Sequence, residues 1–170
     1  KEAERCLAAL SPFVDRGIPV VGLEPSCLLG FRDEIPAIVK TAQANKLASH
    51  ALLFEEFLVR ETDASRLRLP LEPIAPRALV HGHCHQKAFD AFGAVEQVLR
   101  LIPDLAVEPI ESSCCGMAGS FGYAADTIEV SLAMGELSLL PAVRKAPPDA
   151  LIVADGTSCR HQIHDGTGRD

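Results

Sequence analysis

The chain has 170 residues, of which 48% are hydrophobic, and its formal net charge is -7 at pH 7. That length allows one ordinary domain with its own core. The acidic balance argues against a nucleic-acid partner, because phosphate binding depends on clustered Lys and Arg.

The apolar stretches fall far short of the roughly 20 residues that a transmembrane segment needs, so none is expected. The N-terminus has no secretory pattern. We therefore expect a cytoplasmic protein, or one that is peripheral at the inner face of a membrane. Because the sequence opens on Lys1 rather than Met, we also expect it to be an excised piece.

The first third of the chain is expected to contain helices around one strand. Apolar spacing predicts a helix over residues 2–13 and a strand over 18–23. Helical spacing returns at 32–39 and 50–61, with a polar connection between them. Prolines at positions 70, 73 and 76 then predict an extended connection over 67–77.

The rest of the chain alternates strands, predicted over 78–80, 105–110 and 150–154, with helices, predicted over 91–102 and 126–140. This alternation favours an α/β fold with a parallel β-sheet flanked by helices. Ligands of such sheets collect beyond the carboxyl ends of the strands. One edge of the sheet should gather the cysteines that follow predicted strands, which are Cys27, Cys84, Cys114, Cys115 and Cys159.

An internal repeat is indicated by residues 20–27 (VVGLEPSC), which align with residues 152–159 (IVADGTSC). Both read as an apolar strand, a tight turn and Ser-Cys. The match favours two copies of one unit, the first represented only by its end. Any Cys-Cys pair of that first copy is then expected upstream of Lys1.

Six cysteines could form three disulfides, but the composition is not that of a small secreted scaffold. In a reducing compartment, clustered thiols indicate metal ligands or redox groups. Thiolates suit zinc, copper(I) and iron–sulfur clusters. We expect a metal centre, with an iron–sulfur cluster favoured, where four of the thiols converge: Cys84, Cys114, Cys115 and Cys159.

The neighbouring Cys114 and Cys115 can face the same way only in a turn, because side chains alternate along an extended backbone. Gly116 and Gly119 supply the freedom for that turn and let main-chain N–H groups approach an anionic cluster. The alternative is a buried apolar pair of free cysteines.

Three histidines lie close to Cys84 in the sequence. If the strand continues, His81, His83 and His85 share one face and Cys84 points to the other. Histidines near a cluster can donate hydrogen bonds to sulfur or carry a proton coupled to electron transfer. The alternative for each is a structural or surface histidine.

Two other kinds of cysteine site stay open. A zinc ion could use the same four thiols, although no C-x₂₋₄-C knuckle is present. A thiol enzyme would lack both C-x-x-C and an evident catalytic partner. The loop 116–122 is no dinucleotide fingerprint, because it follows Cys-Cys rather than leading directly from strand to helix.

Taken together, His83-Cys84-His85, Cys114-Cys115-Gly116 and Thr157-Ser158-Cys159 resemble the cysteine-rich CCG domain. This family includes the cysteine-rich subunit of heterodisulfide reductase, the iron–sulfur subunits of glycolate and glycerol-3-phosphate oxidoreductases, and the C-terminal ends of FAD-linked oxidases. The resemblance covers residues 23–164. It is strongest to the fused type, in which an FAD-binding oxidase of D-lactate or D-2-hydroxyglutarate precedes iron–sulfur segments.

The resemblance implies a ligand set, because each family repeat supplies a cysteine, a Cys-Cys-Gly and a C-x-x-C pair. It assigns Cys84, Cys114, Cys115 and Cys159 as metal ligands around Gly116, with His83 and His85 beside them. Gly156 replaces the first cysteine of C-x-x-C, which disfavours a noncubane cluster but leaves enough thiolates for a 4Fe–4S centre. Cys27 matches the last cysteine of a preceding copy; an orphaned thiol is preferred over an extra ligand, and Cys6 is expected in the core.

The repeat and the resemblance together predict the domain organisation. Residues 1–66 would hold the end of a first CCG-type repeat plus connecting helices. Residues 67–170 would form the second, cysteine-rich repeat, with the chain packed as one globular unit.

The function implied by the resemblance is electron transfer within an oxidoreductase. FAD on another domain or subunit would take a hydride from a 2-hydroxy acid, and this domain would pass electrons to a quinone or other carrier without being catalytic alone. The alternatives are a zinc-stabilised docking domain without a redox role and a thiol enzyme with a low-pKa cysteine.

Overall fold

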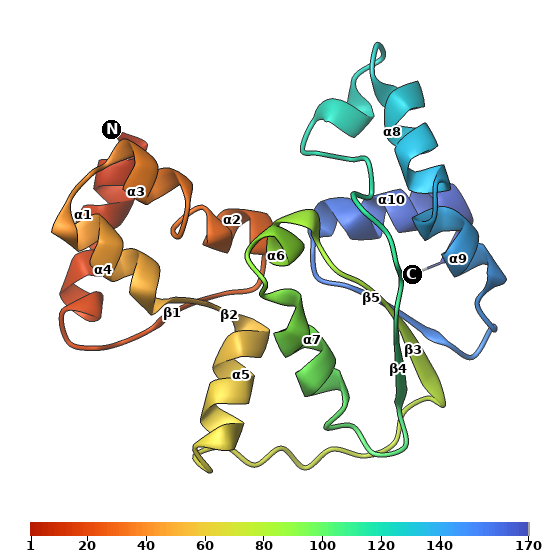
Figure 1. Cartoon of the computed structure of the whole chain (residues 1–170), viewed down its shortest axis with the longest axis horizontal. Helices are drawn as coiled ribbons and strands as arrows, with labels where there is room; N and C mark the ends of the chain where they lie inside the picture. Colours follow the sequence, from red (N-terminus) through yellow and green to blue (C-terminus); the bar gives the residue numbers. More distant parts are fainter. Residues whose placement is uncertain (170) are drawn as a thin grey trace. The chain divides into compact units, whose positions relative to one another are not determined.

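The computed structural model describes residues 1–169. They fall into two compact units, of which the first is Lys1–Leu67 and the second begins at Arg68. Each unit has its own parallel sheet and its own helices (Figure 1). The α/β fold with parallel strands flanked by helices is thus confirmed, and cysteines lie near strand ends. The single sheet expected from the sequence is wrong, because the strands form two separate sheets.

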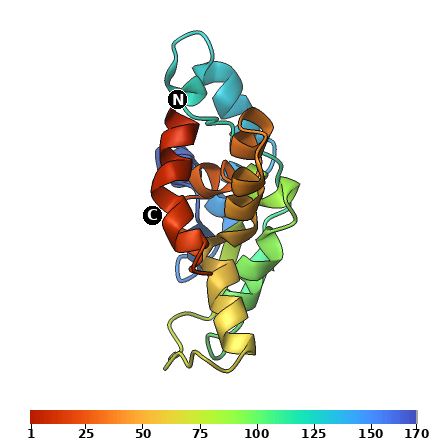
Figure 2. The same cartoon turned by 90° about the vertical axis from the view of Figure 1, so that its left-hand side faces the viewer.

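The first unit surrounds a two-stranded sheet, in which Val20 pairs with Ala51. Its core joins Leu7 and Val14 to Leu47, and the half-buried Cys6 packs against this core as expected. Figure 2 shows the unit from the side of its first helix, which packs against the fourth. The elements in chain order are α1 (Glu2–Val14), β1 (Val20–Gly22), α2 (Pro25–Leu29), α3 (Glu34–Ile38), α4 (Ala42–His50), β2 (Ala51–Leu53) and α5 (Phe54–Asp63).

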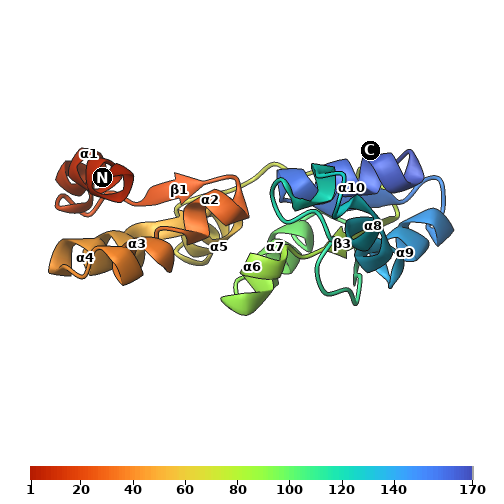
Figure 3. The same cartoon turned by 90° about the horizontal axis from the view of Figure 1, so that it is seen from above.

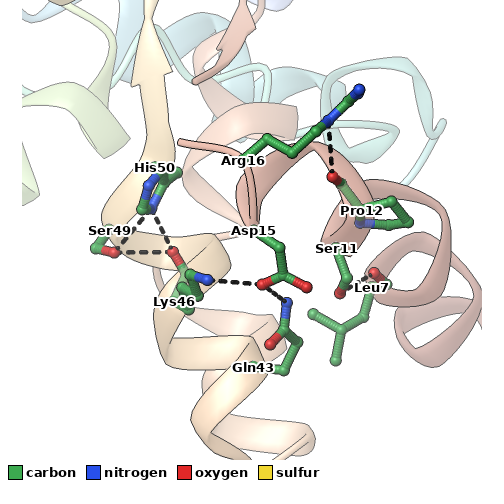
Figure 4. Close-up of polar contacts among 9 residues, drawn as sticks. All are labelled: Leu7, Ser11, Pro12, Asp15, Arg16, Gln43, Lys46, Ser49 and His50. Atoms are coloured by element: carbon green, nitrogen blue, oxygen red, sulfur yellow. Dashed lines mark hydrogen bonds and ion pairs between the residues drawn. The ribbon is translucent and has the colours of Figure 1, made fainter. Parts of the chain in front are cut away.

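Polar contacts fasten the end of α1 to α4 (Figure 4). Asp15 accepts hydrogen bonds from Lys46 Nζ at 2.6 Å and from Gln43 Nε2 at 3.2 Å. These contacts lower the pKa of Asp15, with the hydrogen bond from Lys46 as the largest cause. The side chain therefore favours its charged form in the folded unit.

The prediction of a helix over residues 50–61 is wrong in its first residues, because Ala51–Leu53 is the strand β2. Helix α4 was not predicted at all. Its buried residues are only Ala44 and Leu47, so the apolar spacing is too sparse to read. The predicted connection over 67–77 has no helix or strand until β3 begins at Arg77.

The second unit is built on a three-stranded parallel sheet with the order β4-β3-β5. In the register, Ala78 of β3 pairs with Val107 of β4 and Leu151 of β5. The elements are β3 (Arg77–His81), α6 (Cys84–Ala88), α7 (Phe92–Leu99), β4 (Ala106–Pro109), η1 (Phe121–Tyr123), α8 (Ile128–Glu136), α9 (Leu139–Lys145), β5 (Leu151–Ala154) and α10 (Thr157–Thr167).

Helices cover both faces of this sheet (Figures 1 and 3). Ala78 and Val80 of β3 pack with Val95 of α7 on one face. Leu79 faces the other way, against a core formed by α9, α10 and the loop after β4, which includes Cys115 and Cys159. Alternation along β3 therefore turns the next odd residue, His81, toward the cysteine side.

Within residues 1–169, none of the helices combines the length and apolarity that crossing a bilayer requires. The interpretation of the two units as parts of CCG-type repeats stays a prediction.

Candidate metal centre

The three strands of the second unit deliver its cysteines to one edge of the sheet. Cys84 is the first residue of α6, directly after β3. Cys114 and Cys115 lie in the loop after β4, and Cys159 lies in the first turn of α10, after β5. Because the strands are parallel, their carboxyl ends meet at the same edge.

The four thiols lie close enough to affect one another's pKa values. Cys159 is hydrogen-bonded to Cys115, which is the largest cause that lowers the pKa of Cys115 to about 4. The same bond, together with burial, raises the pKa of Cys159. Cys84 is hydrogen-bonded to Cys114, whose pKa is raised mainly by burial. The structure thus brings together all four cysteines that the sequence singled out, and their role as ligands stays a prediction.

The thiols are unequally exposed. Cys115 and Cys159 are buried, Cys114 is half-buried, and Cys84 is exposed. The group is therefore closed on the side of the core and open at the start of α6.

The turn that aims both neighbouring cysteines depends on Gly116. Its φ is +97°, and a Cβ atom there would overlap the carbonyl oxygen of Ser131 in α8. The Gly116 N–H donates to Cys114 Sγ at 3.3 Å. Gly119 also has a positive φ, of +65°, as the expected turn requires.

His81 lies at the site, although the family resemblance assigned only His83 and His85 there. Its side chain is buried, and its ligand atom lies within 4.8 Å of those of Cys115 and Cys159. The expectation that His81 shares a face with His83 and His85, away from Cys84, is wrong because β3 ends at His81. The signal available in the sequence was the alternation of side chains along the strand, which puts His81 on the same face as Leu79.

The other two histidines shape α6. The His83 N–H donates to Gln86 Oε1 at 3.0 Å, and His83 Nδ1 accepts from the N–H of His85 at 3.2 Å, so His83 caps the helix. The ring of His85 packs edge-on against Phe89. Their predicted role beside a cluster is untested.

A contact with His83 explains why position 156 holds a glycine. A Cβ atom at this position would lie 2.5 Å from His83 Cδ2 and 3.3 Å from Cys159 Sγ. A cysteine at Gly156 would therefore displace the His83 ring.

Two further side chains tie α6 to its surroundings. Gln86 Nε2 donates to Asp155 Oδ2 at 2.7 Å, at the end of β5. Lys87 Nζ donates to the carbonyl oxygens of Ser112 and, at 3.2 Å, Ser113. Burial lowers the pKa of Lys87, whereas the four thiols act to raise it. Lys87 thus brings a positive charge to the thiols, and its place one turn after Cys84 was the signal in the sequence.

Cys27 lies in the first unit, exposed on α2. It borders a surface hollow of about 410 Å³ together with residues of β1 and Phe31. The preference for an orphaned thiol over an extra ligand stays a prediction.

Comparison with known proteins identifies relatives among dehydrogenases. The chain is 30% identical over 152 residues to one subunit of the anaerobic glycerol-3-phosphate dehydrogenase of Escherichia coli K12, covering 89% of this chain and 37% of that protein. It is 29% identical over 161 residues to the D-2-hydroxyglutarate dehydrogenase of Pantoea ananatis, covering 86% of the chain and 14% of the relative. The D-2-hydroxyglutarate dehydrogenase of E. coli K12 is 28% identical over an alignment of 173 positions, which covers 99% of the chain and 16% of the relative.

These relatives and the clustered cysteines fit a CCG-type iron–sulfur domain. The resemblance read from the sequence is thereby confirmed. The chain spans little more than a third of the glycerol-3-phosphate dehydrogenase subunit and about a sixth of the D-2-hydroxyglutarate dehydrogenase of E. coli. No family model and no solved structure matches it.

The donor set suits a metal–thiolate centre on its own chemistry. The sulfurs of Cys115 and Cys159 converge with the buried imidazole of His81, and Cys84 and Cys114 lie near enough to affect them. The Gly116 N–H donates to Cys114 Sγ, and Lys87 adds a positive charge. Soft ligands of this kind select zinc, copper(I) or iron–sulfur clusters.

Proposed function

We propose that this domain holds an iron–sulfur cluster, of the 4Fe–4S type, and transfers electrons for an FAD-linked 2-hydroxy-acid oxidoreductase. The flavin would lie on another domain or subunit, and the electrons would leave to a quinone or other carrier. The observation that carries the proposal is the convergence of Cys84, Cys114, Cys115 and Cys159 at one edge of a parallel sheet.

These four thiolates would bind the cluster, which supplies a site that gains and loses one electron at a time. Gly116 would hold the loop of Cys114 and Cys115 in place and donate to Cys114 Sγ. Lys87 would offset the negative charge of the thiolates and so favour the reduced state. Burial of Cys115 and Cys159 would keep water from the inner side of the centre.

The names of the relatives support the proposed setting. Glycerol-3-phosphate and D-2-hydroxyglutarate both carry a hydroxyl that a dehydrogenase oxidises, and the chain is similar to part of each enzyme. The exposed Cys84 marks the side on which a partner would approach the centre. A cytoplasmic place, or one at the inner face of a membrane, is part of the proposal, as is the origin of residues 1–66 as the end of a first repeat.

The test is anaerobic purification of the full-length protein, followed by iron, sulfide and zinc analysis and visible spectroscopy. We expect a brown protein with iron and sulfide in equal amounts. Cys115→Ser should abolish loading, because it removes a buried ligand, whereas Cys6→Ser should leave it intact. Equal iron in both variants would contradict the ligand assignment.

A zinc-stabilised docking domain is the second candidate. The compact group of His81, Cys115 and Cys159 would also suit a single tetrahedral ion. A colourless protein that carries one equivalent of zinc and no sulfide would favour this function over electron transfer.

A further inference from the structure

We infer that His81 is itself a ligand of the metal centre, binding through Nε2 beside Cys115 and Cys159. The inference rests on the proposed function, because it needs a metal centre at the strand ends. A 4Fe–4S cluster takes four protein ligands, so His81 would stand in the place that the proposed function gives to the exposed Cys84, beside Cys114, Cys115 and Cys159.

The first observation is an unpaired buried atom. The His81 side chain is 1% exposed, and its Nε2 has no hydrogen-bond partner of ordinary geometry within residues 1–169. Buried polar atoms are nearly always paired, and one that is not calls for a specific reason, such as an ion. His81 belongs, with Cys115 and Cys159, to a group whose ligand atoms lie within 4.8 Å of one another.

The second observation is the partner of the other ring nitrogen. His81 Nδ1 lies 2.7 Å from Ser112 Oγ, a hydroxyl oxygen that can accept a hydrogen bond. The inference places the ring proton on Nδ1, which leaves a lone pair on Nε2. Metal-bound histidines usually donate their second ring N–H in this way, which orients the ring and raises its basicity.

The third observation is distance. One ligand atom from each of His81, Cys115 and Cys159 lies within 4.8 Å of the other two. The three side chains therefore face the same space at the strand ends.

The pattern of the strand explains why His81 reaches the site at all. Leu79 packs into the core that contains Cys115 and Cys159, and His81 is the next residue on the same face. The imidazole is therefore directed by the sheet itself, whereas Cys84 is placed by the following helix.

Isotope labelling of the full-length protein provides the test. Protein grown with ¹⁵N-histidine is purified anaerobically, reduced with dithionite and measured by pulsed electron paramagnetic resonance. A strongly coupled nitrogen that changes from ¹⁴N to ¹⁵N is expected. This comparison uses the unaltered protein, so it does not depend on whether a variant folds.

Variants identify which histidine is responsible. His81→Cys should retain the cluster, lose the coupled nitrogen and titrate at a lower potential, because a thiolate replaces a neutral donor. His50→Asn is the control and should keep the signal, since His50 lies in α4 of the first unit and contacts the carbonyl oxygen of Lys46.

The outcomes separate the inference from the proposed function. A cluster without a coupled histidine nitrogen, or a signal that survives in His81→Cys, would overturn the inference and leave electron transfer standing. A zinc protein whose X-ray absorption shows a nitrogen ligand lost in His81→Cys would support the ligand and overturn electron transfer. A protein without any metal would refute both.

Discussion

Gly116 and Ser131 touch backbone to backbone: the space of a Cβ atom on Gly116 is occupied by the carbonyl oxygen of Ser131. The contact sets the loop of the neighbouring cysteines directly on α8. Gly116→Ala should destabilise the protein by about 2–4 kcal/mol, because it combines a clash with an unfavourable positive φ. Urea unfolding of the metal-free protein measures this loss, and iron content should fall in parallel.

Gly119 is the matched control for this change. Its φ is also positive, but nothing lies within 4 Å of the position of a Cβ atom. Gly119→Ala should cost only about 1 kcal/mol, the penalty for the backbone conformation alone. Equal losses in the two variants would show that the contact with Ser131 has no energetic importance.

The core beneath the centre depends on Leu140. This fully buried side chain of α9 packs with Cys115, Cys159 and Ile163. Leu140→Ala should destabilise the protein by about 2–5 kcal/mol through lost burial and a cavity. Leu137→Ala, at a residue that is 77% exposed, should change stability by less than about 0.5 kcal/mol. Thermal and urea unfolding of both variants would check the difference.

Lys87 should influence the potential of the centre. Lys87→Met removes a positive charge near the four thiols and the hydrogen bonds to Ser112 and Ser113. Because reduction adds negative charge, the midpoint potential should fall, and a redox titration would measure the shift. Lys87→Arg keeps the charge and should keep most of the potential. A potential that is unchanged in Lys87→Met would contradict the electrostatic role.

Protonation of Glu61 at low pH should lower the stability of the first unit. Hydrogen bonds from Arg66 and then Arg60 lower its pKa from 4.5 to about 2. The folded state therefore favours the carboxylate, and this contribution is complete above pH 4.5 and is lost as the pH falls from 4.5 through about 2. Urea unfolding at several pH values should show a smaller decline over that window in Glu61→Gln. Identical profiles would mean that the contacts with arginine do not contribute.

The sequence was most informative where the strands are apolar and end in cysteines. Residues 78–80, 105–110 and 150–154 were placed nearly correctly, and the parallel order carried Cys84, Cys115 and Cys159 to one edge. Strand ends need only local composition, which is why this part of the site could be predicted.

The missed features depend on contacts between distant residues. β2 has only 3 residues, too few for a visible alternation, and it exists because it pairs with β1. The approach of His81 to the thiols required knowing that β3 stops at that residue. The sequence presented Gly156 only as a missing cysteine, and its contact with His83 gives the steric reason.

Helix α6 touches the ends of all three strands of its sheet. It follows β3 directly, Gln86 ties it to Asp155 after β5, and Lys87 ties it to the loop after β4. With only 5 residues, it has little internal freedom to absorb a displacement. In the proposed electron transfer, these ties would limit the movement of the cysteines when the centre gains or loses an electron, and so keep the reorganisation energy low.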